Sequence, residues 1–193
     1  MRRQAVHLSG VGFVALLVAF GPVASVLALA ISLSSLVLGF YRSRIPVPRR
    51  LEPLLRFADR FERPGGFPYF GVFSFYFSVA AVSSLFPVWI SSLSVTVLSV
   101  HDSVATLAGK MFGRTRIPFN PEKSVEGFLA GLVAGTAAAV LVSAVLGIDP
   151  RMALAASVSG AFIESLPHRV RRLRIDDNFT VAFGTSLVLF FLF

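Results

Sequence analysis

The sequence predicts an all-α integral membrane protein, a polytopic bundle that forms a single domain over residues 1–193. Hydrophobic residues make up 55% of the chain and charged residues only 15%, and the mean hydropathy is +0.77, far from the values of soluble domains. Apolar stretches of near-spanning length also recur between Gly/Pro breaks and charged loops. We therefore expect about seven transmembrane helices, at residues 5–21, 22–40, 67–86, 88–111, 125–147, 151–166 and 179–193.

The first two stretches follow Met1-Arg2-Arg3 and imitate a secretory signal peptide, with Ala28-Leu29-Ala30 in the place of a cleavage site. The apolar residues continue to Phe40, well beyond the length of a signal sequence, so we interpret them as two spans separated at Gly21-Pro22. The first and last of the seven stretches are short for spans, at roughly 15 to 17 residues.

Residues 49–63 form the expected basic amphipathic helix at the membrane interface. Apolar residues recur there at helical spacing, arginines occupy the other faces, and Pro64-Gly65-Gly66 ends the segment. The next span begins with seven aromatic residues between Phe67 and Phe77. These indicate either an interfacial aromatic belt or a wall for a long lipid chain.

The basic residues predict the orientation. With seven spans and a cytoplasmic N-terminus, all 18 lysines and arginines except Arg151 fall on the cytoplasmic side, and the C-terminus is external. The net charge of +8 then lies on one face, where it suits anionic headgroups or phosphates, and no nucleic-acid partner is expected. The chain has no cysteine, which excludes disulfides and thiolate sites, and three scattered histidines do not suggest a His-rich metal site.

Asp102 is the most informative residue, because a carboxylate inside a span costs roughly 2.5–3.5 kcal/mol and therefore indicates function. Ala105, Gly109 and Gly113 share its helix face. The groove that these small residues leave could admit a ligand or, alternatively, another helix in small-xxx-small packing.

Other polar residues are expected at the same depth and on the same side: Glu126, Glu164 and Asp177. Together with Lys123 and Ser124 at a helix start, they suit a hydrated magnesium ion that holds a polyphosphate. The alternatives are loop salt bridges for the acidic residues near Arg169 to Arg174, and compensation of the helix dipole for Glu126.

The arrangement Asp102-x2-Ala105-x3-Gly109-x3-Gly113, followed by Pro118 and Lys123-Ser124-x-Glu126-Gly127, resembles the CTP-binding signature of the dolichol kinase family. This family belongs to the wider superfamily that includes phosphatidate cytidylyltransferases. Arg3-x3-His7 with Gly10 resembles a further element of the family, although Gln4 stands where a lysine is usual. The segments Glu164-Ser165-Leu166-Pro167 and Asp176-Asp177-Asn178 resemble its C-terminal element.

The resemblance implies transfer of the γ-phosphoryl group of CTP to the hydroxyl of a membrane alcohol at the cytoplasmic face. Dolichol or another polyprenol is the first expectation, with phytol, geranylgeraniol or diacylglycerol as alternatives. The implied catalytic residues are Asp102, Asp177 and Lys123, and the implied Mg²⁺ ligands are Asp102, Asp177 and Glu164. The implied nucleotide contacts are Ala105, Gly109, Gly113, Lys123, Ser124, Glu126, Gly127 and Asn178, whereas Arg3, His7 and Asp176 have no defined role.

Two other functions compete with this one. A cytidylyltransferase would make a CDP-lipid from a lipid phosphate, but that branch usually carries His-Gly-Gly and Asp-Arg-x-Asp stretches that nothing near the C-terminus of this chain matches. A small transporter would spread its charges through the membrane depth, whereas here they gather on one side. The expected partners are CTP, a long-chain lipid alcohol and membrane lipids, and the sequence leaves open whether the chain acts as a homodimer.

Overall fold

A computed structural model describes residues 3–44, 50, 52–59, 67–170, 173–174 and 176–193. The described chain is mainly helical, which confirms the helical class. Its helices are α1 (Arg3–Phe20), α2 (Pro22–Arg44), α3 (Glu52–Asp59), α4 (Phe70–Leu85), α5 (Val88–Phe112), α6 (Val125–Leu146), α7 (Pro150–Ser165) and α8 (Asp177–Leu192). Four short strands form two antiparallel hairpins: β1 (Arg116–Ile117) with β2 (Asn120–Ser124), and β3 (Arg169–Val170) with β4 (Leu173–Arg174).

The helix boundaries follow from local backbone chemistry. Gly21 has a φ of +49° between α1 and α2, and Gly147 has a φ of +66° where α6 ends, a left-handed conformation that glycine adopts without strain. Asp149 caps α7, because its side chain accepts a hydrogen bond from the Arg151 N–H at 2.8 Å. Asp176 caps α8 in the same way, so this helix begins at Asp177 rather than at the expected residue 179.

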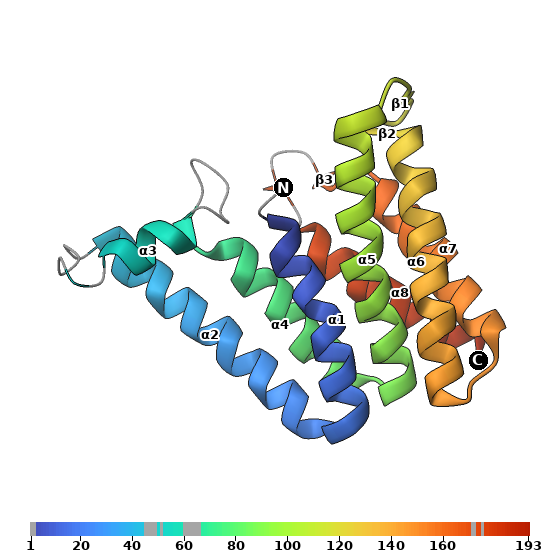
Figure 1. Cartoon of the computed structure of the whole chain (residues 1–193), viewed down its shortest axis with the longest axis horizontal. Helices are drawn as coiled ribbons and strands as arrows, with labels where there is room; N and C mark the ends of the chain where they lie inside the picture. Colours follow the sequence, from blue (N-terminus) through green and yellow to red (C-terminus); the bar gives the residue numbers. More distant parts are fainter. Residues whose placement is uncertain (1–2, 45–49, 51, 60–66, 171–172, 175) are drawn as a thin grey trace.

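Three helices, α2, α5 and α6, are long and apolar enough to cross a membrane by length and composition. The apolar parts of α1, α4 and α8 are shorter. Figure 1 shows the start of α1, α3 and the hairpins toward one end of the molecule, while the α1–α2 turn, the α6–α7 connection and the end of α8 lie toward the other. A membrane protein is compatible with these helices, and seven spans with a cytoplasmic N-terminus stay a prediction.

α5 is the central helix of the bundle. In its most apolar window 72% of the residues are buried, against 33% in α2 and 22% in α6. It packs against α1, α6, α7 and α8, and its buried side chains belong to both apolar clusters of the core. The other two candidate spans instead expose large apolar side chains on their outer faces, as helices that contact lipid do.

α5 and α6 approach each other so closely that side chains are excluded between them. A Cβ atom on Gly127 would lie 2.6 Å from the Ala105 carbonyl oxygen, and one on Gly113 would lie 2.7 Å from Ser124 Oγ. The face of Ala105, Gly109 and Gly113 is therefore covered by α6 and Ser124. The packing agrees with the small-xxx-small alternative, and the expected nucleotide contacts of this face stay a prediction.

α2 and α4 form a second layer that carries α3. Arg42 of α2 contacts Asp59 at 3.0 Å and Glu52 at 3.4 Å, and the Tyr69 hydroxyl donates to Asp59 at 2.9 Å. These charged contacts hold the short helix between the end of α2 and the start of α4. The expected interfacial helix at 49–63 is thus seen as Glu52–Asp59, and its remaining positions, apart from residue 50, lie outside the described residues.

The β1–β2 hairpin was not expected and connects α5 to α6. Ser124 ends β2 and caps α6, since its Oγ accepts a hydrogen bond from the Gly127 N–H at 3.1 Å. The Glu126 carboxylate accepts hydrogen bonds from the Thr115 N–H at 3.0 and 3.2 Å. Both side chains therefore fasten the hairpin onto the first turn of α6.

Candidate active site

Asp102 lies midway along α5 and is approached by His7 from the second turn of α1. The His7 Nδ1 atom is 3.2 Å from Asp102 Oδ2, and the two side chains are only 6% and 16% exposed. The His7 ring also meets the Phe75 ring edge-on, with centroids 5.0 Å apart. The first helix therefore supplies a buried neighbour to the carboxylate, and the sequence had left the role of His7 undefined.

Lys123 and Glu164 form an ion pair between β2 and the end of α7. The Lys123 Nζ atom contacts Glu164 Oε1 and donates to the Glu164 carbonyl oxygen. The Glu164 side chain is 5% exposed and that of Lys123 is 24% exposed. Because a buried carboxylate without a partner is strongly unfavourable, this lysine is the natural counter-charge for Glu164.

Asn120 fastens β2 to α7 beside this ion pair. Its Nδ2 group donates to the carbonyl oxygens of Ser165 at 3.0 Å and Leu166 at 3.1 Å, and its Oδ1 atom accepts from the Glu122 N–H at 3.3 Å. These contacts satisfy carbonyl groups that the end of α7 leaves unpaired. Asn120 therefore sets the position of the strand that carries Lys123.

The start of α8 brings a third acidic group to the same place. Asp177 is the first residue of α8 and lies close enough to Glu164 and His168 to interact electrostatically with both. Asn178 is buried and donates from Nδ2 to Ser74 Oγ at 2.9 Å, which fixes α8 to α4. Burial raises the pKa of Asp176, and the adjacent charge of Asp177 adds to the shift.

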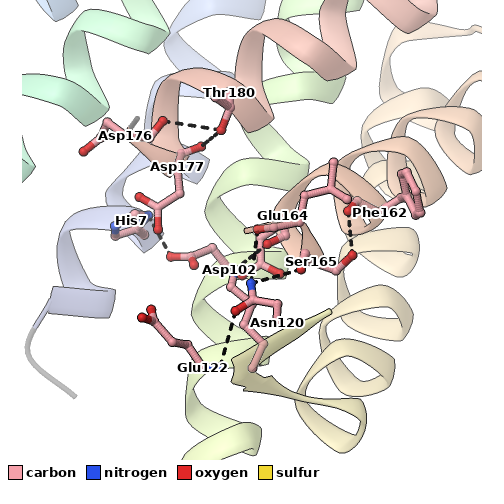
Figure 2. A network of polar contacts seen from close by, with 12 residues as sticks. His7, Asp102, Asn120, Glu122, Phe162, Glu164, Ser165, Asp176, Asp177 and Thr180 are labelled. Atoms are coloured by element: carbon pink, nitrogen blue, oxygen red, sulfur yellow. Dashed lines mark hydrogen bonds and ion pairs between the residues drawn. The ribbon is translucent and has the colours of Figure 1, made fainter. Parts of the chain in front are cut away.

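Figure 2 shows these side chains converging from α1, α5, α7, α8 and the β1–β2 hairpin. Asp102, Glu164 and Asp177 are near enough to interact electrostatically, and Lys123 contributes the neighbouring positive charge. In the described part of the chain, no three acidic or histidine side chains form a ready-made metal cage. A cation here would thus have one or two protein carboxylates and would need further ligands from a substrate.

His168 lies in the loop after α7 and joins the electrostatics of this cluster. Burial lowers its pKa, while the charge of Asp177 opposes that shift and the charge of Lys123 adds to it. The net shift favours the neutral form of the imidazole. A neutral histidine in this loop can donate one hydrogen bond and accept another without adding a positive charge to the cluster.

The structure separates the expected site residues into two groups. Asp102, Lys123, Glu164 and Asp177 come together, whereas the residues of the expected nucleotide face lie between α5 and α6 or fasten the hairpin: Ala105, Gly109, Gly113, Ser124, Glu126 and Gly127. The side chain of Arg3 lies outside the described residues. Sequence reasoning missed Asn120 and His168, and the only signal for either was a position next to an expected site segment.

The chain is similar to known proteins over most of its length. The sequence model of the family described as "Cytidylyltransferase family" matches residues 7–168. A probable phytol kinase 1 of the chloroplast from Glycine max is 31% identical over 115 residues, which are 54% of this chain and 37% of that protein. A chloroplast farnesol kinase from Arabidopsis thaliana is 30% identical over 132 residues, 61% of this chain and 42% of that protein.

The chain spans about two fifths of the length of these curated relatives. No solved structure matches it closely enough to count as a relative. The match over residues 7–168 includes Asp102, Lys123 and Glu164, and the relatives agree with the resemblance seen in the sequence. The protein is therefore a member of the cytidylyltransferase family.

Proposed function

We propose that this protein transfers the γ-phosphoryl group of CTP to the hydroxyl group of an isoprenoid alcohol in the membrane. The observation that carries the proposal is the meeting of Asp102, Asp177 and the Lys123–Glu164 pair at one end of the bundle. Support for a kinase comes from the two relatives, which are named as phytol and farnesol kinases.

The residues of the cluster match the needs of phosphoryl transfer. This reaction requires positioned phosphates, cations on the departing diphosphate and a carboxylate that takes the proton of the attacking hydroxyl. Lys123 would bind the phosphates, and one of the two aspartates would take the proton. His7 would help to position Asp102, since its Nδ1 atom lies 3.2 Å from Asp102 Oδ2.

A magnesium ion would supply charge neutralisation on the phosphates, and Asp102 and Asp177 are the residues that would hold it. Mg²⁺ commonly binds one or two protein carboxylates together with substrate phosphates and water, which fits the small number of acidic groups here. Glu164 fits the role of a metal ligand less well than expected, because Lys123 occupies its carboxylate. We assign Glu164 to the positioning of Lys123.

The acceptor is proposed as a class rather than as one compound. The names of the relatives favour isoprenoid alcohols of the phytol or farnesol type over dolichol, which was the first expectation from the sequence. The reaction would take place at the cytoplasmic face. The basic loops are expected on that side, and two of them contain the hairpins. Dolichol, longer polyprenols and diacylglycerol remain substrates to be compared.

The family description supports a second candidate, the transfer of cytidylyl from CTP to a lipid phosphate. The products distinguish the two reactions, because a kinase releases CDP and a cytidylyltransferase releases pyrophosphate. Purified protein in lipid nanodiscs is supplied with CTP, Mg²⁺ and either isoprenoid alcohols or lipid phosphates. We expect CDP in step with lipid monophosphate, and pyrophosphate in step with CDP-lipid would establish the second candidate instead.

Asp102→Asn and Asp177→Asn test the site in the same assay. Each keeps the shape of the side chain but removes its charge, so turnover should fall by about a hundredfold or more. Asp102→Asn should retain folding, since a carboxylate inside a span opposes insertion and its neutral form does not. Asp177→Asn removes a favourable charge from the first turn of α8 and should cost only about 0.3–1 kcal/mol of stability. A variant with near-native turnover would exclude that aspartate from the chemistry.

A further inference from the structure

A continuous row of phenylalanine rings runs along α4 and α8, outside the polar cluster. Each ring contacts the next, with centroids 4.9 to 6.5 Å apart. We call this surface the phenylalanine row, and in order along the contacts it consists of Phe73, Phe77, Phe179, Phe183, Phe86 and Phe190.

The row extends along α8 from the end of the helix where Asp177 lies. Phe179 follows Asp177 by two residues, and Phe190 lies in the last turn of α8. At about 1.5 Å per residue, α8 advances roughly 20 Å from Asp177 to Phe190, two thirds of a hydrocarbon core of roughly 30 Å. A chain bound along the row would therefore begin at the level of Asp177 along α8 and end roughly 20 Å further along the helix.

The first four rings of the row are stacked, and three rings of the row are exposed. The pairs from Phe73 to Phe183 have ring planes only 22° to 25° apart. Phe86 then meets Phe183 and Phe190 edge-on, at 78° and 72°. Phe77, Phe179 and Phe190 are 40%, 38% and 55% exposed, so the row is accessible along its length.

An apolar strip is not by itself a binding site in a membrane, since lipid tails are as apolar as phenylalanine. This strip has two further properties: it begins at the end of α8 where Asp177 lies, and its ring spacing is comparable to the length of one isoprene unit. We propose that the phenylalanine row binds the isoprenoid chain of the acceptor alcohol, with the hydroxyl group beside Asp177 and the distal end near Phe190. The inference rests on the proposed function and names the site that selects its substrate.

Alcohols of different isoprenoid length provide the test. Phe179→Ala, Phe190→Ala and the control Phe162→Ala are compared in nanodiscs with CTP and geraniol, farnesol or geranylgeraniol. Phe162 is a suitable control because it is 57% exposed on α7, away from the row. Phe179→Ala should raise KM about threefold to tenfold for all three alcohols, since aromatic contacts are worth about 0.5–1.5 kcal/mol. Phe190→Ala should raise KM for geranylgeraniol and leave geraniol unchanged, because the short chain ends before it.

Equal effects of Phe190→Ala on all three alcohols, or an effect of Phe162→Ala as large as that of Phe179→Ala, would overturn the proposal. A photoreactive isoprenoid alcohol gives a readout that does not require turnover. Its cross-links should concentrate on α4 and α8 and disappear with excess geranylgeraniol but not with excess phospholipid. Labelling spread over all helices would show a general lipid surface, while confined labelling without CDP formation would refute the proposed kinase reaction alone.

Discussion

Replacing Lys123 by Met separates the two roles that the structure gives this lysine. As the partner of Glu164 it contributes to stability, and as the expected phosphate ligand it contributes to turnover. Removal of one partner of a buried ion pair costs about 3–5 kcal/mol. Because Lys123 is 24% exposed and water reaches that end of the pair, we expect about 2–3 kcal/mol, or a decrease in melting temperature of roughly 5–10 °C.

The double variant Lys123→Met/Glu164→Gln distinguishes the roles. The neutral glutamine needs no counter-charge, so the melting temperature should return close to the wild-type value. Turnover should stay about a hundredfold or more below wild type in both the single and the double variant, because neither has a cation for the phosphates. The matched control is Lys110→Met, which removes the other lysine of the chain from an exposed position on α5.

Melting temperatures are measured in detergent from the fluorescence of an added dye that binds unfolded protein. Turnover is measured as CDP release. A double variant with turnover within about threefold of wild type would refute the phosphate role of Lys123. A single variant that melts at the same temperature as Lys110→Met would refute the ion pair as a source of stability.

Two further perturbations test the packing and the electrostatics. Gly127→Ala should destabilise the protein by about 1–3 kcal/mol, because its Cβ would lie 2.6 Å from the Ala105 carbonyl oxygen; Gly12→Ala, with open space around it, should be neutral or stabilising in the same thermal melts. His168 has a lowered pKa in the folded protein, so its contribution to stability is present above its ordinary value of about 6.5 and is lost as the pH falls through the folded pKa. Between pH 7 and pH 5 the melting temperature of His168→Asn should therefore decrease less than that of the wild type. An equal decrease in both proteins would exclude this contribution.

The helices were predictable because an apolar stretch of sufficient length leaves the backbone few alternatives in a membrane. Asp102, Glu164 and Asp177 were predictable for a related reason, since an acidic group in or next to such a stretch needs a compensating function. Their convergence required only that successive helices alternate in direction. These inferences need only the local sequence and the cost of placing a charged group in a bilayer.

The role of the glycine face was not predictable from the same information. Gly109 and Gly113 leave equal room in the sequence for a nucleotide and for a neighbouring helix, and the close approach of Gly127 to α5 is seen only in the structure. The hairpin between α5 and α6 has no apolar periodicity, so the engagement of Glu126 by Thr115 and of Asn120 by the end of α7 could not be foreseen. The contact between His7 and Asp102 likewise depends on how α1 is placed against α5.

The three acidic residues of the cluster lie at different positions along their helices. Glu164 lies in the last turn of α7 and Asp177 is the first residue of α8, so both are at helix ends, while Asp102 alone lies within a helix. α5 continues for ten residues beyond Asp102, or about 15 Å, and Figure 1 shows its end and the β1–β2 hairpin standing above the starts of α1 and α8.

This difference in height would give the two proposed substrates separate approaches to one place. Arg114 and Arg116 are exposed beyond the end of α5, where they would attract a polyphosphate from the aqueous side. The phenylalanine row begins on α4 and at the start of α8, the end of that helix where Asp177 lies. Under the proposed function, a water-soluble phosphoryl donor and a lipid hydroxyl would meet at Asp102 and Asp177 while the lipid chain stays within the hydrocarbon core.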